Sequence, residues 1–127
     1  MSDKFTVEII SPDKSVFKSD AIEVTIPSYE GQMGILKDHI PLITFLRPGF
    51  ISIKNQNEKK YYVEEGTVEF SNNSLLILTS TAKDLENFDK NLINKLIQDA
   101  ENLNSNSLSD KDQYLASYKI NTLKEIN

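Results

Sequence analysis

Few residues of this 127-residue sequence could carry out chemistry, and the first candidate is His39, the only histidine. Asp38 directly precedes it. A His–Asp pair acts in catalysis only beside a nucleophile, and a metal site would need further ligands brought from elsewhere. The sequence contains none of the motifs GxxxxGK(S/T), GxGxxG, HExxH and GxSxG. We therefore interpret His39 as a residue of a turn or an interface. An enzyme that uses Asp38 and His39 is the weakest alternative.

Two pairs of neighbouring charges, Glu64–Glu65 and Lys59–Lys60, are the next candidates. Neighbouring residues of a strand point to opposite faces, so the two carboxylates cannot flank one substrate as they do in a glycosidase. We interpret the lysine pair as the solvated flank of a hairpin. The sequence thus predicts no catalytic, cofactor-binding or metal site, and we expect a protein that is not an enzyme.

The composition narrows the class of protein further. Hydrophobic residues make up 39% of the chain and charged residues 26%, as in a folded domain. There are 14 basic and 19 acidic residues, and the net charge of −5 provides no basic face for nucleic acid. Cysteine is absent, which excludes disulfides and thiolate zinc sites. No apolar run approaches the ~18 residues that cross a bilayer, and the first residues do not resemble a secretory signal. We expect a soluble protein that meets a membrane only through partners.

The elements that must position these residues differ between two parts of the chain. Up to about Ser80, apolar and polar residues alternate as in half-buried strands, in Phe5–Ile9, Ile22–Ile26, Ile51–Ile53, Tyr61–Val63, Val68–Phe70 and Leu76–Leu78. Turn-forming residues separate these runs, and Asn72–Asn73 predicts a hairpin turn because asparagine tolerates positive φ. Short strands without intervening helices predict an antiparallel β-sandwich, which we assign to residues 1–86.

Residues 87–127 show a helical period instead. One apolar stripe comprises Leu92, Ile93, Leu96, Ile97, Ala100 and Leu103, with Asp89 as its expected N-cap. Polar residues 104–107 interrupt the pattern, and residues 109–112 resemble a capping box that starts a second helix. On that helix Leu115, Ala116, Leu123 and Ile126 share one side. The predicted fold class is α+β, mostly β, with an N-terminal antiparallel sandwich and a C-terminal antiparallel two-helix hairpin.

A segment between two predicted strands is suited to recognition. Gly31 and Gly34 bracket Gln32 and Met33, and we expect an exposed loop with Met33 at its tip. The alternative interpretation is a tight inter-strand turn without a partner.

The sequence from Glu30 to Gly49, EGQMGILKDHIPLITFLRPG, resembles the pattern EGxxGILPxHAPLLTxLxPG of the epsilon subunits of F-type ATP synthases. Residues 5–12 resemble the first strand of that family, and residues 65–82 resemble its GGFxEVxxNxVTVLAxTA segment. The departures are Ser28 for the usual glycine, Lys37 for the usual proline and Glu65 for the first glycine of the GG pair. The resemblance extends over essentially the whole chain, including the terminal helices.

The resemblance implies a non-catalytic subunit of the central stalk of a rotary motor, which couples proton-driven rotation to ATP synthesis on other subunits. It implies binding to the gamma subunit and to the polar loops of the c-subunit ring, at the cytoplasmic face of the bacterial inner membrane. Carried over by position, the ring contacts are Glu30, Gly31, Gln32, Met33 and Gly34, and the gamma contact is His39. The rival class is a free-standing β-sandwich module that binds a carbohydrate or a peptide.

The terminal helices inhibit ATP hydrolysis in some relatives, where basic residues contact the alpha and beta subunits. Residues 89–127 contain no arginine and lack the (I/L)DxxRA motif with which some relatives bind ATP. The candidates for basic contacts are Lys111, Lys119 and Lys124. Lys119 falls within the apolar arc of the second helix, so we expect either a stem that lies on that face or a charge masked in the folded hairpin. Because lysine lacks the guanidinium fork, any inhibitory contact should be weak.

Overall fold

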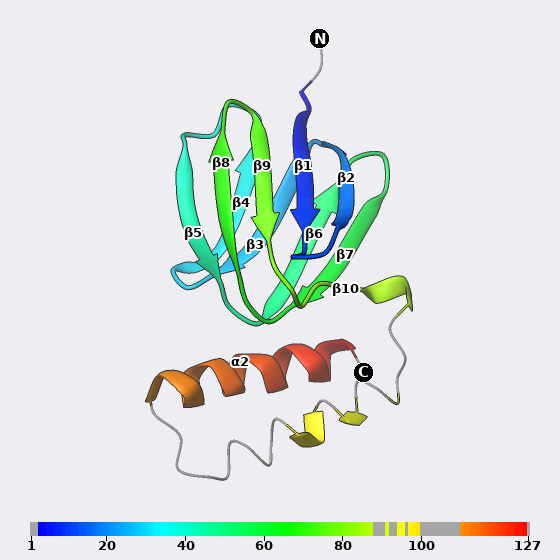
Figure 1. Cartoon of the computed structure of the whole chain (residues 1–127), viewed down its shortest axis with the longest axis vertical. Helices are drawn as coiled ribbons and strands as arrows, with labels where there is room; N and C mark the ends of the chain where they lie inside the picture. Colours follow the sequence, from blue (N-terminus) through cyan, green and yellow to red (C-terminus); the bar gives the residue numbers. More distant parts are fainter. Residues whose placement is uncertain (1–2, 88–90, 92–93, 96, 100–109, 127) are drawn as a thin grey trace.

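The computed structural model of the chain consists of strands followed by helical segments (Figure 1). It describes residues 3–87, 91, 94–95, 97–99 and 110–126. The elements are β1 (Phe5–Ile10), β2 (Ser15–Ala21), β3 (Glu23–Ser28), β4 (Gly31–Leu36), β5 (Leu42–Leu46), β6 (Gly49–Lys54), β7 (Glu58–Val63), β8 (Gly66–Ser71), β9 (Ser74–Leu78), β10 (Lys83–Asp84), the 3-10 turn η1 (Leu85–Asn87) and the helix α2 (Asp110–Ile126).

The strands form a sandwich of two layers, as predicted. One layer has the order β5-β8-β9-β1-β2 and the other the order β4-β3-β6-β7-β10, and the two are joined where Ser28 pairs with Leu46 (Figure 1). The pairs are antiparallel except for β1 and β9, which run parallel. The expectation of an entirely antiparallel sandwich is therefore wrong at this pair. The alternation in β1 identifies a strand but does not indicate the direction of its neighbour.

The core fills the space between the inner faces of the two layers. It is one cluster of buried side chains that reaches from Phe5 to Ile77 along the chain. In β1 and β6 the buried hydrophobic residues are those that the alternation predicts: Phe5, Val7, Ile9, Ile51 and Ile53. In β3 Val24 and Ile26 are buried as predicted, but Pro27 and Ser28 are buried as well. Ile22, which was expected on the same face, precedes the strand and is 42% exposed. These strands are well predicted because burying one face imposes a period of two residues.

The turn between β8 and β9 confirms the hairpin but reverses the expected faces of β9. Asn72 and Asn73 have φ values of 51° and 56°, as a two-residue hairpin turn requires. Leu75 and Ile77 are fully buried, whereas Leu78 is 45% exposed. The alternation predicted for Leu76–Leu78, which would bury Leu76 and Leu78 together, is thus wrong. Four consecutive apolar residues carry no alternation, so the turn, which pairs Ser71 with Ser74, sets the face.

The segment expected to be an exposed loop is the strand β4, which pairs with β3 along its whole length. Met33 faces inward beside the buried Ile35 and packs against the core, while Gln32 and Gly34 are exposed. The tip of this hairpin is formed by Tyr29 and Glu30. The placement of Met33 at a turn tip is therefore wrong, because the two glycines do not interrupt the strand.

The helix α2 packs its buried side against the end of the sandwich, as Figure 1 shows. Leu123 is fully buried against Tyr62, and Ile97 packs against the same small cluster. Ile120, which was not among the predicted apolar positions, is buried as well. Residues 91, 94, 95 and 97–99 are helical, but Asp89 and most of the predicted first helix lie outside the described residues.

We predict that Met33→Asp destabilises the isolated chain, because it places a carboxylate against the core. The free energy of unfolding should fall by about 1–3 kcal/mol. Gln32→Asp is the matched control, since it introduces the same charge one residue away on the exposed face, and it should change stability by less than about 0.5 kcal/mol. Urea denaturation measures both variants. Equal stabilities would contradict the inward placement of Met33.

We also propose that residues 1–86 fold without residues 87–127, because the main cluster lies entirely within β1–β10 and their connections. The fragment should unfold cooperatively, and it should lose the ~1.5–3 kcal/mol that burial of a leucine such as Leu123 contributes.

Burial raises the pKa of Tyr62 far above that of an exposed phenol in the full chain. Since removal of α2 uncovers this ring, Tyr62 should ionise at lower pH in the fragment. Ultraviolet titration of the phenolate, with Tyr62→Phe as control, measures the change. A fragment that aggregates or melts without cooperativity contradicts the proposal.

Candidate functional site

The loop that carries His39 is held by a reciprocal pair of hydrogen bonds. The main-chain N–H of Asp38 donates to Oδ1 of Asn73 at 2.7 Å, and Nδ2 of Asn73 donates to the Asp38 carboxylate at 2.9 Å. The His39 ring lies edge-on to Phe70, and its Nδ1 lies 2.7 Å from the carbonyl oxygen of Ile40, to which it donates. Asp38 and His39 thus turn to different partners, and the geometry is not that of a catalytic dyad.

The outer face of β5 is apolar, whereas the outward residues of the adjacent β8 are Thr67, Glu69 and Ser71. In β5 the polar Thr44 is buried, whereas Ile43 and Phe45 are 72% and 58% exposed. The ordinary arrangement of a half-buried strand is the reverse. Phe45 is in register with Thr67, and Thr67 with Leu78, so Thr67 lies between these two exposed side chains. Ile43 is in register with the exposed Glu69. We call the exposed residues Ile40, Ile43, Phe45 and Leu78 the apolar face.

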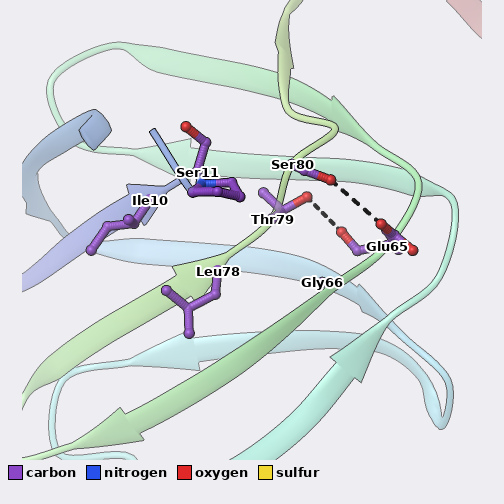
Figure 2. A pocket seen from close by; sticks show the side chains of 8 residues that line it. Ile10, Ser11, Glu65, Gly66, Leu78, Thr79 and Ser80 are labelled. Carbon is purple, nitrogen blue, oxygen red and sulfur yellow. Dashed lines mark hydrogen bonds between the residues drawn. The ribbon is translucent and has the colours of Figure 1, made fainter. Parts of the chain in front are cut away.

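Two shallow hollows adjoin the apolar face on either side of Gly66. One, of about 440 Å³, lies between the end of β9 and the segment after β1; Figure 2 shows its lining residues. The hydroxyl of Thr79 donates to the carbonyl of Glu65 there at 2.5 Å. The other, of about 490 Å³, lies between the ends of β5 and β8 and includes Tyr29 and Phe45. A Cβ on Gly66 would lie 2.6 Å from the carbonyl oxygen of Leu78, so only glycine allows this close approach of β8 and β9.

The interface between α2 and the sandwich combines a few apolar contacts with polar ones. Lys119 Nζ lies 2.6 Å from Glu64 Oε1, and both side chains are about one quarter exposed. The guanidinium carbon of Arg47 lies 3.9 Å from the centre of the Tyr118 ring. The Thr122 hydroxyl lies 3.4 Å from the carbonyl oxygen of Pro48 in the sandwich, and within the helix it donates to the carbonyl of Tyr118 at 2.7 Å. The sandwich therefore pairs the charge of Lys119 through Glu64, so its ammonium is not simply solvated.

The other charged residues singled out in the sequence lie apart from one another and have different partners. Lys59 Nζ contacts Asp84 at 3.0 Å, and this hydrogen bond raises the pKa of Lys59. Lys60 is more exposed and contacts Glu58, so only one of the two lysines is a solvated flank. Glu64 contacts α2 and Glu65 lines a hollow. Both lie in the connection between β7 and β8, so the strand alternation from which their separation was predicted does not apply. Lys124 lies in the last turn of α2, and the side chain of Lys111 lies outside the described residues.

The residues predicted to contact a ring and those predicted to contact gamma lie at opposite ends of β4. Glu30 belongs to the turn that precedes the strand, and His39 to the loop that follows it (Figure 1). Gly31, Gln32, Met33 and Gly34 form the first part of the strand itself. The structure therefore brings Glu30 close to Gly31 but not to His39.

These surfaces are suited to binding rather than to catalysis. Within the described residues, no three histidine or acidic side chains are grouped closely enough to hold a metal ion. The described helices also include none that is long and apolar enough to span a membrane. The sequence interpretation missed Ile43, Phe45 and Arg47 as candidates. The sequence offers one indication of Ile43 and Phe45: they alternate with Thr44 and Leu46, which are buried, and so point to the opposite face of the strand.

Comparisons with known proteins agree on one family. The sequence model of the β-sandwich domain of the ATP synthase delta/epsilon chain matches residues 4–84. An ATP synthase epsilon chain of Pelagibacter ubique is 47% identical over 130 residues, which cover 100% of both chains. A mitochondrial ATP synthase subunit delta of Schizosaccharomyces pombe is 35% identical over 76% of this chain and 60% of its own length.

Two solved structures share the fold at low sequence identity. A chain of the cryo-EM structure of the Euglena gracilis mitochondrial ATP synthase superposes with a TM-score of 0.79 at 20% identity, covering 98% of this chain and 82% of that chain. A chain of the central stalk and c-ring of the Tetrahymena thermophila enzyme has a TM-score of 0.64 at 16% identity, with coverages of 94% and 93%. With the family match and the full-length relative, the conclusion is that this chain belongs to the family of ATP synthase delta and epsilon chains.

Proposed function

We propose that this chain joins the gamma subunit to the c-subunit ring by two separate surfaces of its sandwich. As a member of the epsilon family it is a non-catalytic subunit of the central stalk of a rotary ATP synthase. The apolar face and the His39 loop bind the gamma subunit. The Tyr29–Glu30 turn and the beginning of β4 rest on the ring.

The inverted pattern of β5 is the observation that carries the gamma contact. The strand β5 buries Thr44 and exposes Ile43 and Phe45, so it leaves apolar surface in water unless a partner covers it. Of the seven large apolar side chains that are exposed among the described residues, three lie in the short stretch from Ile40 to Phe45. The concentration in one stretch favours one extensive interface over scattered exposure.

The position of β4 supports a link between two partners. Six strand residues at ~3.3 Å each separate the Glu30 turn from the His39 loop by roughly 20 Å. A partner at one end therefore leaves the other end accessible. The subunit would meet the membrane only through these partners, on the cytoplasmic face of the bacterial inner membrane.

A second role, regulation by the C-terminal helices, is favoured by the Lys119–Glu64 ion pair. While α2 is docked, Glu64 neutralises Lys119. If the proposed hairpin opens, Lys119 becomes available to acidic groups of the alpha and beta subunits, together with Lys111 and Lys124. The partly exposed Lys119–Glu64 ion pair contributes about 1 kcal/mol or less, so it opposes undocking of α2 only slightly. The inhibition is weak for a different reason: lysine lacks the guanidinium fork with which arginine binds a carboxylate.

We predict that the purified chain binds its cognate gamma subunit at micromolar concentration and hydrolyses no ATP. Replacing Ile43 and Phe45 together by aspartate should weaken gamma binding at least about a hundredfold, since two apolar contacts are each replaced by a charge that must be desolvated. Ile22→Asp is the matched control, because Ile22 is 42% exposed outside the apolar face. Calorimetry measures the affinities. Equal losses in all variants, or no complex of the unmodified chain, would refute the gamma contact.

We predict that deletion of residues 109–127 raises ATP hydrolysis by the assembled complex only modestly. Lys119→Ala should reproduce part of that increase, because it removes the charge that would face the catalytic subunits. Lys18→Ala, on the distant strand β2, serves as the control. Steady-state hydrolysis at two salt concentrations measures the effect, which should shrink at high salt. A large increase on deletion, matched in full by Lys119→Ala alone, would contradict weak inhibition.

A further inference from the structure

The connection between β7 and β8 carries a residue that holds α2. It consists of Glu64 and Glu65 and crosses from one layer of the sandwich to the other. Because these residues lie outside the strands, their main-chain N–H groups need partners other than a neighbouring strand. The Glu64 carboxylate lies 2.6 Å from Nζ of Lys119 in α2. The position of this carboxylate therefore depends on what fixes a connection of two residues.

Two threonines of the segment after β9 fix this connection. Oγ1 of Thr81 accepts from the N–H of Glu64 at 2.9 Å and from that of Glu65 at 3.4 Å. The Thr79 hydroxyl donates to the carbonyl of Glu65 at 2.5 Å (Figure 2). The two hydroxyl oxygens are 3.0 Å apart. A hydroxyl has one hydrogen, and that of Thr79 is directed at Glu65, so Thr81 donates to Thr79.

These hydrogen bonds run in one direction, from the Glu64 N–H through Thr81 and Thr79 to the Glu65 carbonyl. Hydrogen bonds in such a chain polarise and strengthen one another. Thr79 is 5% exposed, and its Oγ1 also accepts from the N–H of Thr81 at 3.1 Å. The threonines therefore hold the main chain of Glu64 in the place from which its side chain reaches α2.

The helix has a second contact with the same part of the sandwich. Leu123 packs against Tyr62, which precedes Glu64 by two residues. Lys119 and Leu123 are four residues apart, so they lie on one face of α2. An apolar contact has no preferred direction, whereas the bond between Lys119 and Glu64 has a defined distance and angle. The ion pair therefore specifies how the helix sits on the Tyr62–Leu123 contact.

We propose that Thr79 and Thr81 are positioning residues of a latch, in which they direct the Glu64 carboxylate at Lys119 and thereby favour the docked state of α2. The latch lies within the chain and needs no partner. Only its effect on ATP hydrolysis rests on the proposed function, because Lys119 reaches other subunits after α2 has undocked. The latch cannot contribute more than the ion pair itself, so its loss should raise the undocked fraction about three- to fivefold.

Amide exchange measured by NMR on the full chain tests the latch, because the amides of residues 120–123 report the opening of α2. Thr81→Val removes the hydroxyl and should raise the opening constant of α2 about three- to fivefold. Thr81→Ser keeps the hydroxyl and should change this constant less than about twofold. The amides of β1 are followed separately, so that a general loss of stability is not counted as undocking. Equal opening of α2 in the three proteins overturns the proposal.

Lys119→Met distinguishes the latch from a merely structural role of Thr81, because methionine keeps an unbranched stem without the charge. If Thr81 acts through Glu64 and Lys119, Thr81→Val should change the opening of α2 less than about twofold in the Lys119→Met chain. The same increase in both backgrounds overturns the proposal. Coupling is reciprocal, so Lys119→Met alone should speed exchange of the Glu64 amide. If the valine variant does not fold, this measurement decides, and an unchanged Glu64 amide overturns the latch.

ATP hydrolysis by the assembled complex separates the latch from the proposed regulation. If both hold, Thr81→Val lowers the rate of hydrolysis, since Lys119 is undocked more often, and Lys119→Met abolishes this decrease. Faster opening of α2 in the free chain with unchanged hydrolysis supports the latch and overturns the regulatory role alone.

Discussion

The two-residue turn at Asn72–Asn73 is the constraint on which most of the sandwich depends. Both residues have positive φ, and this two-residue turn pairs Ser71 with Ser74, which fixes the register between β8 and β9. A slip of one residue would turn Leu75 and Ile77 outward and empty part of the core. The Asn73 side chain also holds Asp38 in the loop before β5, and the main-chain carbonyl of Asn73 accepts from the N–H of Thr6 at 3.1 Å. One turn thereby sets the face of β9, anchors β1 beside it and positions the His39 loop against Phe70.

The surfaces of the sandwich differ in the kind of contact that they offer. The apolar face exposes side chains that water solvates poorly. Its contacts do not depend strongly on ionic strength, because these side chains form no ion pairs. In a stalk that transmits torque, such contacts would hold a partner in place. This physical character agrees with the family to which the chain belongs and with a role as a mechanical link.

The contacts of α2 have the opposite character. Apart from a small cluster around Tyr62 and Leu123, the helix is held by the Lys119–Glu64 ion pair and by Arg47 beside the Tyr118 ring. These polar contacts lie near the surface, where each contributes little free energy and salt weakens it. A helix attached in this way can leave the sandwich without opening the main core. The docking of α2 therefore depends mainly on the small Tyr62–Leu123 cluster and on contacts that salt weakens.

The sequence by itself determined the elements whose pattern is local. Alternation identified β1, β3 and β6, the two asparagines identified the hairpin turn, and the 3.6-residue period identified α2. The motif from Glu30 to Gly49 identified the family. Tertiary structure alone decided the inward position of Met33, the outward position of Leu78, the parallel pairing of β1 with β9 and the ion pair of Lys119 with Glu64. The physical reason is that periodicity reports one buried face of one element. Which neighbour lies on that face, and which edge stays open, follow from contacts between residues far apart in the chain.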